Sequence, residues 1–211
     1  VLASTDPDLG ARGLSLFCVE ENQPGFTKGT PLSKIGQHCQ DTCELYFDGL
    51  RLPVDCLLGR ENNAFEYLTQ ALRGEGPATA RPAGAPLEGL TDEPAEYTRN
   101  RKVFGRRVID YQNSRFKLAS ARAQATMLRV FLDDCLEMHM AGELDATRAA
   151  IAKLNATEMQ GAILDDLLQL YGGYGYMAEY GIGRAWADAR ALRLFGGTSE
   201  IMREIIGRGF A

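Results

Sequence analysis

The sequence lacks the features that would assign it to several large classes of protein. Its five cysteines form no Cys-x-x-Cys pair and only two histidines occur, so a zinc site is not expected. No apolar run approaches the roughly 20 residues that a helix needs to cross a bilayer. A formal net charge of -5 provides no broad basic surface for nucleic acid. These absences predict no metal, no nucleic-acid partner and no membrane span, and the scattered cysteines predict reduced thiols in a cytoplasmic compartment.

The first residues, VLASTDPDLGARG, contain neither the basic nor the apolar segment of a signal peptide. They also lack an initial methionine and open like a β-strand, so we expect a fragment of a longer chain. The composition, 45% hydrophobic and 24% charged, is that of an ordinary globular protein. A length of 211 residues suffices for one good core or two small domains.

Two segments near the start of the chain have the composition of β-strands. Residues 13–20 read GLSLFCVE, and in residues 42–48, TCELYFD, a face of cysteine, leucine and phenylalanine alternates with a face of glutamate and tyrosine. Between them, residues 23–32 read QPGFTKGTPL, and their prolines and glycines predict turns. We therefore expect residues 1–61 to be the second part of an antiparallel β domain.

The rest of the chain has mainly helical patterns. An apolar stripe runs along residues 114–140, after which Ala141 and Gly142 break the helix. Asp145 can cap a second helix that extends to Leu170, with Gly172 or Gly173 as its stop. The stripe of the first helix comprises Phe116, Leu118, Ala119, Ala123, Met127, Val130, Phe131 and Leu136, and the inward side of the second comprises Ile151, Leu154, Met159, Ile163, Leu167 and Leu170.

Two shorter helices are expected near residues 184–193 and over about 199–208, the latter capped by Thr198 or Ser199. Two long antiparallel helices joined by a short turn imply a bundle. The predicted fold class is therefore α+β, with a partial antiparallel β domain followed by a C-terminal up-and-down α-helical bundle over residues 62–211.

Residues 73–96 interrupt the helical pattern. They include four prolines and four glycines, which cannot form a continuous helix. The composition predicts a disordered loop or linker, although a structureless stretch of that length is unusual inside a compact domain.

Three segments carry residues suited to binding a cofactor. Residues 196–201 read GGTSEI, where a helix start exposes backbone N–H groups and the glycines allow a phosphate or carbonyl to approach closely. Residues 101–107, RKVFGRR, place cations around an aromatic ring, and residues 169–176, QLYGGYGY, put glycines at a helix end. Taken singly, a plain helix cap, a solvated basic helix end and ordinary aromatic packing also account for these patterns.

The order of these segments resembles the acyl-CoA dehydrogenase family over nearly the entire chain, and its long-chain branch most of all. The matching segments are GLSLFCVE, KIGQHCQDTCELYFDGLRLPVDCLLG, RKVFG, QLYGGYGYMAEYGIGRAWADAR and LFGGTSEIMREIIGR. The resemblance implies an oxidoreductase of fatty acid metabolism, a flavoprotein that uses FAD to desaturate an acyl-CoA between its α and β carbons. It also implies that an electron-transfer flavoprotein takes up the electrons.

The resemblance further implies roles for single residues. A base removes the α proton while hydride passes to flavin N5, and the backbone N–H of Gly196 polarises the thioester carbonyl together with a flavin ribityl hydroxyl. Thr198 and Glu200 match positions in the flavin contact of the final motif. The positions that touch the flavin of a neighbouring subunit are Arg101, Phe104, Gln169 and Gly173. The cofactor would therefore lie at a subunit interface of a homotetramer or homodimer.

In most of the family the position of Gly196 holds the catalytic glutamate, so this chain needs another base. In the long-chain branch the base comes from the helix after the β domain, and the matching position is Glu75, within the proline-rich residues 73–96. Two compensating frame shifts in the gene would produce such an atypical stretch of unchanged length. Resequencing that finds the frame intact would reject that hypothesis.

Two alternatives remain open. The same scaffold can serve as a non-catalytic or fragmentary subunit that packs and oligomerises without turnover. It can also serve as a flavin oxidase or monooxygenase, because oxygen reactivity depends on access to the pocket and not on the fold. The N-terminal helical domain of the family and the first strands of its β domain are missing from this sequence, so the isolated chain is expected to bind flavin poorly and to be inactive.

Overall fold

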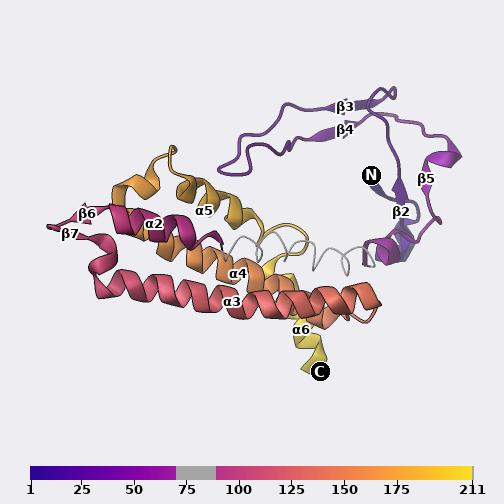
Figure 1. Ribbon diagram of the computed structural model, residues 1–211. Coiled ribbons are helices and arrows are strands. Elements are labelled where there is room, and N and C mark those ends of the chain that lie inside the picture. The colour runs from indigo at the N-terminus through magenta and orange to yellow at the C-terminus, as the bar shows by residue number, and fades with distance from the viewer. Residues whose placement is uncertain (70–88, 211) are drawn as a thin grey trace. The chain divides into compact units, whose positions relative to one another are not determined.

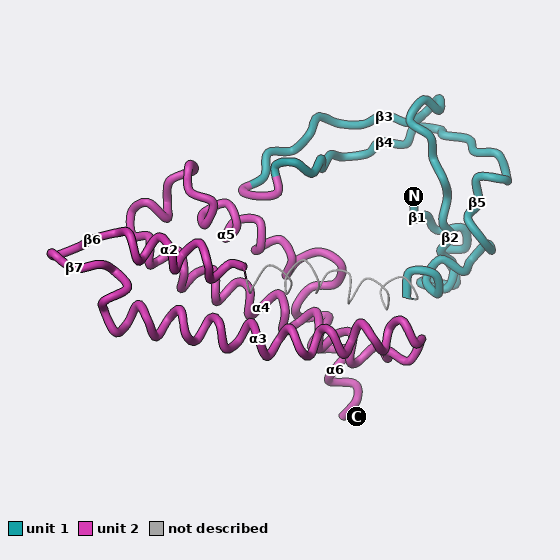
Figure 2. The backbone as a smooth tube through the Cα atoms, viewed as in Figure 1, with its two compact units in different colours: residues 1–34, 38–72 teal, residues 35–37, 73–211 magenta. Residues whose placement is uncertain are grey.

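The computed structural model describes residues 1–69 and 89–210 (Figure 1). The chain divides into two compact units, drawn in teal and magenta in Figure 2. Unit 1 comprises Val1–Lys34 and His38–Leu72, and unit 2 comprises Ile35–Gln37 and Arg73–Ala211. The strands of the first sixty residues therefore belong to unit 1, and the long helices belong to unit 2.

Unit 1 contains two small antiparallel sheets. The first has three strands in the order β1-β2-β5, and the second pairs β3 with β4. The strands are β1 Leu2–Ser4, β2 Leu14–Phe17, β3 Phe26–Lys28, β4 Leu45–Phe47 and β5 Leu57–Leu58, and the short 3-10 helices are η1 Pro7–Gly13 and η2 Val54–Cys56. Residues 64–69 are helical.

The antiparallel β structure predicted for the first sixty residues is confirmed. Strands β2 and β4 lie within the two predicted strand segments, although each is shorter than expected. The prediction of turns in residues 23–32 is confirmed at Pro24 and Gly25, but the segment also contains the strand β3, which was not predicted. There the ring of Phe26 stacks on that of Phe47 with a centroid distance of 5.2 Å. This cross-strand pair stabilises a strand in a segment whose own composition favours turns.

Helix α4 is the central element of unit 2, because it contacts α2, α3, α5 and α6 (Figure 1). The helices are α2 Asp92–Asn100, α3 Gln112–Ala141, α4 Ala146–Tyr171, α5 Gly181–Ala191 and α6 Ser199–Gly207. Between α2 and α3 lie the hairpin of β6 Lys102–Val103 with β7 Arg106–Arg107 and the 3-10 helix η3 Val108–Asp110. The 3-10 helices η4 Gly172–Tyr176 and η5 Arg208–Phe210 follow α4 and α6.

The ends of the helices follow the predicted caps. The side chain of Asp145 accepts a hydrogen bond from the backbone N–H of Arg148 at 2.7 Å and begins α4. Gly142 ends α3 with φ +75° and Gly172 ends α4 with φ +58°, and both values favour glycine. The two long helices therefore form an antiparallel pair across a short turn, and the predicted bundle is confirmed.

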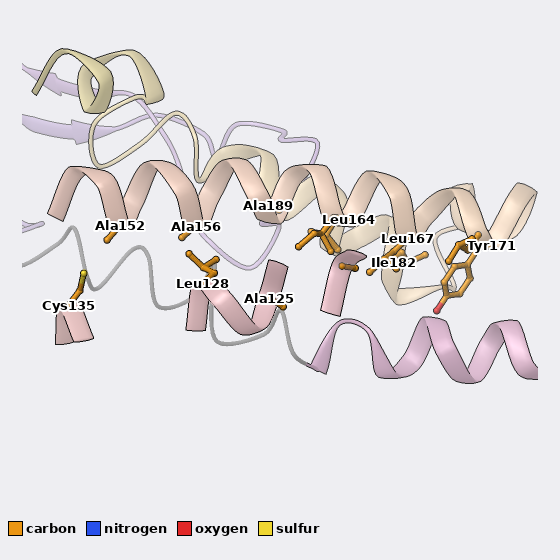
Figure 3. Close-up of a cluster of buried hydrophobic side chains, with 13 residues drawn as sticks. Ala125, Leu128, Cys135, Ala152, Ala156, Leu164, Leu167, Tyr171, Ile182 and Ala189 are labelled. Carbon is orange, nitrogen blue, oxygen red and sulfur yellow. The ribbon is translucent and has the colours of Figure 1, made fainter. Parts of the chain in front are cut away.

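The core of unit 2 lies along the contact between α3 and α4 (Figure 3). Four alanines, Ala121, Ala125, Ala152 and Ala156, are at most 3% exposed and form what we call the alanine seam. Small side chains let the two helices approach closely, and larger residues fill the space beyond them. The other buried members of the cluster are Leu128, Cys135, Ile163, Leu164, Leu167, Leu170, Tyr171, Ile182 and Ala189.

The helix predicted over residues 114–140 is confirmed, but its predicted apolar stripe is partly wrong. Phe116, Met127 and Val130 are 59%, 65% and 67% exposed. The buried side of α3 is instead centred on the alanine seam, and alanine contributes little to an apolar periodicity that larger side chains dominate. On α4 the predicted positions Ile163 and Leu167 are buried as expected.

Part of the proline-rich segment is helical. Residues 70–88 lie outside the described residues, but Asp92–Glu96 belong to α2, so the prediction of a loop or linker is wrong for them. Pro94 is buried in the first turn of that helix. The first N–H groups of a helix have no acceptor within the helix, whatever the residue. A proline in the first turn therefore removes no helical hydrogen bond. No helix within the described residues is long and apolar enough to cross a membrane.

Replacing Leu164 with alanine is expected to destabilise unit 2 by about 2–5 kcal/mol, because the side chain is fully enclosed and a cavity would remain. Leu194→Ala, at a position 58% exposed, is the matched control and is expected to change stability by less than about 0.5 kcal/mol. Denaturant unfolding of both variants checks the prediction. Equal effects of the two substitutions would contradict the packing described above.

Candidate functional site

Four of the residues predicted to contact a cofactor line one pocket of unit 2. Arg101, Phe104, Gln169 and Gly173 surround a volume of about 830 Å³. Its wall comes from the β6–β7 hairpin, the first turn of α3 and the end of α4. The structure therefore brings together residues that are 72 positions apart in the sequence (101 to 173).

Phe104 is held in an unusual conformation at the tip of the hairpin. It has φ +49° and Gly105 has φ +77°, the combination found in a type I′ turn. A bulky residue with positive φ is a backbone outlier, and the side chain of Phe104 is 96% exposed. A ring exposed to this extent adds little to the packing of the described residues. Such outliers cluster at functional sites, so Phe104 is a candidate for contact with a ligand or another chain.

The base of the hairpin is fixed by aromatic residues. The guanidinium carbon of Arg101 lies 5.1 Å from the centroid of the Tyr174 ring, a cation–π geometry. The hydroxyl of Tyr111 donates a hydrogen bond to the backbone oxygen of Val103 at 2.9 Å and ties the hairpin to the start of α3. Arg101 thus presents its charge from a fixed position at the pocket wall.

The glycines after α4 leave open space in the pocket. Gly172 needs its positive φ of +58° to end the helix. Gly173 has no such requirement, and a Cβ atom added there would meet nothing within 4 Å. The fold of the chain therefore does not explain a glycine at 173. A missing side chain beside Gln169 and Arg101 is consistent with room for a bound molecule.

A group of stacked tyrosines supports this end of the bundle, and the sequence analysis did not identify it. The rings of Tyr97 and Tyr171 stack with centroids 4.0 Å apart, and Tyr180 packs edge-on against both. The hydroxyl of Tyr171 donates to Glu93 at 3.2 Å. Burial and the neighbouring Glu93 carboxylate raise the pKa of Tyr171, so the phenol remains protonated and has a structural role.

The second predicted group of residues lies at the start of α6. Gly196 and Gly197 have φ +62° and +89°, a turn that L side chains rarely adopt. Thr198 then caps α6 and accepts a hydrogen bond from the backbone N–H of Ile201 at 3.3 Å. Hydrogen bonds from its own backbone N–H and from the Thr198 hydroxyl lower the pKa of Glu200, whose side chain is 80% exposed.

One side chain of α4 holds this turn and a second holds the start of α6, and both were missed by the sequence analysis. Lys153, only 2% exposed, donates through Nζ to the backbone oxygens of Phe195 at 2.6 Å, Gly196 at 2.9 Å and Gly197. Glu158 accepts a hydrogen bond from the hydroxyl of Ser199 at 2.7 Å. No local sequence signal marks either residue, because each acts on a segment about 40 positions away.

Glu158 is also paired with two arginines. Its Oε1 lies 2.9 Å from the guanidinium of Arg193 and 3.2 Å from that of Arg203. Burial alone would raise the pKa of Glu158, but the Ser199 hydroxyl and the two guanidinium groups outweigh burial and lower it. The carboxylate is therefore ionised at neutral pH and is poorly suited to accept a proton.

The predicted site residues form two separate groups. Gln169 of the pocket and Lys153 beneath the Gly196 turn are 16 residues apart on α4, or roughly 24 Å at the helical rise. Glu75, the predicted base, lies outside the described residues. Within the described part of the chain no group of three or more His, Cys, Asp or Glu side chains is arranged to hold a metal ion.

Comparison with known proteins identifies the family. The model of a family described as "Acyl-CoA dehydrogenase, C-terminal domain" matches residues 62–211. The chain belongs to the acyl-CoA dehydrogenase family.

Relatives in this family extend well beyond the chain. It is 44% identical over 198 residues to the mitochondrial long-chain specific acyl-CoA dehydrogenase of Sus scrofa, covering 94% of this chain and 46% of that protein. The crystal structure of an acyl-CoA dehydrogenase from Geobacillus kaustophilus matches 100% of this chain with 56% of its own, at 39% identity and a TM-score of 0.96. An FAD complex of PigA matches 99% with 55% of its own, at 25% identity and a TM-score of 0.91. The chain thus spans about half the length of the relatives it matches.

The environment of Glu158 predicts a pH-dependent stability. Because its pKa in the folded chain is below the usual value of about 4.3, the carboxylate contributes stability above that pH and loses it as the pH falls through the lowered pKa. Glu158→Gln is expected to cost about 1–3 kcal/mol at pH 7, a difference that shrinks in acid. Unfolding midpoints at pH 7, 5 and 3 check this, with the exposed Glu137→Gln on α3 as control. A cost that is the same at every pH would contradict the assignment.

Proposed function

We propose that the chain is part of an FAD-dependent enzyme that desaturates a fatty acyl-CoA thioester between its α and β carbons. The observation that carries this proposal is the turn at Gly196 and Gly197, which is built to present backbone N–H groups and is held from behind by Lys153. Desaturation starts with loss of an α proton, and a thioester α proton is acidic enough only when its carbonyl oxygen is polarised by hydrogen-bond donors. The N–H of Gly196 is the proposed donor.

The residues of the pocket fit the dinucleotide part of FAD. Arg101 supplies a fixed cation for a pyrophosphate, Phe104 an exposed aromatic ring for stacking, and Gly173 a position without a side chain. Gln169 supplies an amide that can hydrogen-bond. The volume of about 830 Å³ is in the range of cofactor sites. When bound, FAD supplies the acceptor for the hydride that leaves the β carbon.

The two groups of site residues support an oligomeric enzyme. One group, with Gly196, Thr198 and Glu200, lies at the turn before α6. The pocket of the same chain lies roughly 24 Å from that turn along α4, so we infer that the two groups contact different cofactors. We infer that the pocket containing Arg101 and Phe104 serves the FAD of a neighbouring subunit. Each active site would then need residues from two copies, as in a homodimer or homotetramer.

The base is proposed to be Glu75. Gly196 has no side chain, Glu158 is ionised and engaged with two arginines, and the pKa of Glu200 is lowered, so neither carboxylate near the turn is a good proton acceptor. By resemblance to the long-chain branch, Glu75 matches the position that supplies the base there. The reduced enzyme is proposed to pass its electrons to an electron-transfer flavoprotein.

Glu75→Gln in the full-length protein is expected to abolish bleaching of the flavin by a long-chain acyl-CoA without oxygen, while most of the flavin stays bound. The matched control is Glu96→Gln, an exposed carboxylate on α2, which is expected to bleach at the wild-type rate. Absorbance near the flavin maximum, recorded before and after acyl-CoA is added, is the measurement. Full bleaching in Glu75→Gln rejects this base, and a wild-type protein that binds FAD but never bleaches supports the non-catalytic alternative.

Phe104→Ala in the full-length protein is expected to weaken FAD binding about 10-fold, because a stacking contact with an aromatic ring is removed. The unfolding free energy is expected to be unchanged or slightly higher, since a small residue fits the turn no worse and the ring is 96% exposed. Phe210→Ala, at a position 91% exposed, is the control for loss of a surface aromatic ring. Titration of apoprotein with FAD measures the affinities, and equal affinities for both variants would count against the proposed contact.

A further inference from the structure

Lys153 is a buried charge whose role behind the Gly196 turn has not yet been explained. Its side chain is only 2% exposed and lies on the central helix of unit 2. Removing an ammonium group from water is costly unless hydrogen bonds replace those to the solvent. The reason for a lysine at this position must therefore be found in what its Nζ binds.

The ammonium group binds three successive backbone oxygens. They belong to Phe195, Gly196 and Gly197, with distances of 2.6 Å and 2.9 Å for the first two. An ammonium has three donors, and three carbonyls that converge on it can satisfy all of them. Successive carbonyls point to one side only where the backbone curls, and the φ angles of +62° and +89° at the two glycines produce that curl. The lysine and the glycine pair therefore explain each other.

The same contacts fix the direction of the N–H groups. In a planar trans peptide the C=O and the N–H point to opposite sides, and the described part of the chain has no cis peptide bond. The oxygen of Phe195 shares its peptide unit with the N–H of Gly196. Because that oxygen points toward Lys153, the Gly196 N–H points away from it. The next peptide unit orients the Gly197 N–H in the same way.

These N–H groups point away from Lys153. Among the described residues, neither the Gly196 N–H nor the Gly197 N–H has a hydrogen-bond acceptor. The cation behind them adds two effects. A hydrogen bond to the carbonyl polarises the peptide and strengthens its N–H as a donor. A fixed positive charge on the far side also favours negative charge that develops at the acceptor.

Anchoring of α6 does not account for Lys153. The start of that helix is already held by Glu158, which binds the Ser199 hydroxyl, and by the Thr198 cap. The three backbone oxygens that Lys153 Nζ binds belong to the peptide units before the cap. What it adds is the orientation of the turn.

We propose that Lys153 is a positioning residue of the dehydrogenation, which holds the Gly196 N–H toward the thioester carbonyl of the acyl-CoA and raises its strength as a donor. The proposal rests on the proposed function. It assigns the lysine no contact with the substrate, only an effect through the peptide bond between Phe195 and Gly196.

The test compares Lys153→Met with wild type in the full-length FAD enzyme. Two quantities are measured: the rate of flavin bleaching by a long-chain acyl-CoA without oxygen, and the infrared C=O stretching frequency of bound enoyl-CoA labelled at its thioester carbonyl. In wild type the frequency should be lower than in water. In Lys153→Met we expect a rate about 10- to 100-fold lower, with FAD still bound, and a frequency shifted toward the free value.

Two further variants separate orientation from stability. Glu158→Gln should lower the unfolding midpoint but leave the carbonyl frequency as in wild type. Lys28→Met, a lysine of β3 with its side chain 46% exposed, is the matched control and should change neither quantity. If Lys153→Met fails to fold, Lys153→Arg replaces it, because a planar guanidinium keeps the charge but cannot direct three donors from one atom. Its bleaching rate should be lower than that of wild type, and its carbonyl frequency should lie between that of the wild-type complex and that of free enoyl-CoA.

The outcomes are distinguishable. The positioning role is overturned if folded Lys153→Met has the wild-type rate and carbonyl frequency. If Lys153→Met does not fold, the same result in Lys153→Arg overturns it. Either result leaves the proposed function intact. A wild-type enzyme that binds FAD but is not bleached by acyl-CoA overturns the proposed function, and the role of Lys153 falls with it.

Discussion

The close approach of α3 to α4 is the constraint on which unit 2 depends. The side chains of the alanine seam are small, so the two long helices approach closely and pack against each other. Helix α4 is thereby placed at the centre, where it also contacts α2, α5 and α6. One consequence is functional: a single helix supplies Lys153 to the turn before α6 and Glu158 to the first residue of α6, and it ends in the residues that line the pocket.

Charge compensation helps to fix the C-terminal motif. Helix α6 has only nine residues, too few to be stable alone. A buried cation holds the carbonyls that precede it, and a partly buried anion holds the hydroxyl and two guanidinium groups at and around its start. The cation binds carbonyl oxygens and the anion binds hydrogen-bond donors, so burial of each charge costs less than burial of an unpaired group. The two glycines, which adopt positive φ without strain, can therefore be held in a defined geometry.

Local signals predicted the ends of the elements better than their faces. Asp145, Gly142 and Gly172 act within a few residues of their own position, and the sequence alone was enough to place them. The buried face of α3 depends on which helix it meets, and alanines do not stand out in an apolar pattern. Strand β3 needed Phe47 as its partner, which lies 21 positions beyond Phe26. Lys153 and Glu158 were missed for the same reason, since their roles exist only after the chain has folded.

Three positions carry residues that the fold of a single chain does not explain. The ring of Phe104 is exposed on a strained turn, Gly173 borders open space, and the N–H of Gly196 has no acceptor among the described residues. The first two belong to the pocket and the third to the turn roughly 24 Å away along α4. Under the proposed function, one copy completes the cofactor site of another and receives the same in return. A single subunit contains both the pocket and the Gly196 turn, but the two are too far apart to form one site. Selection for activity therefore also acts on the assembly of subunits.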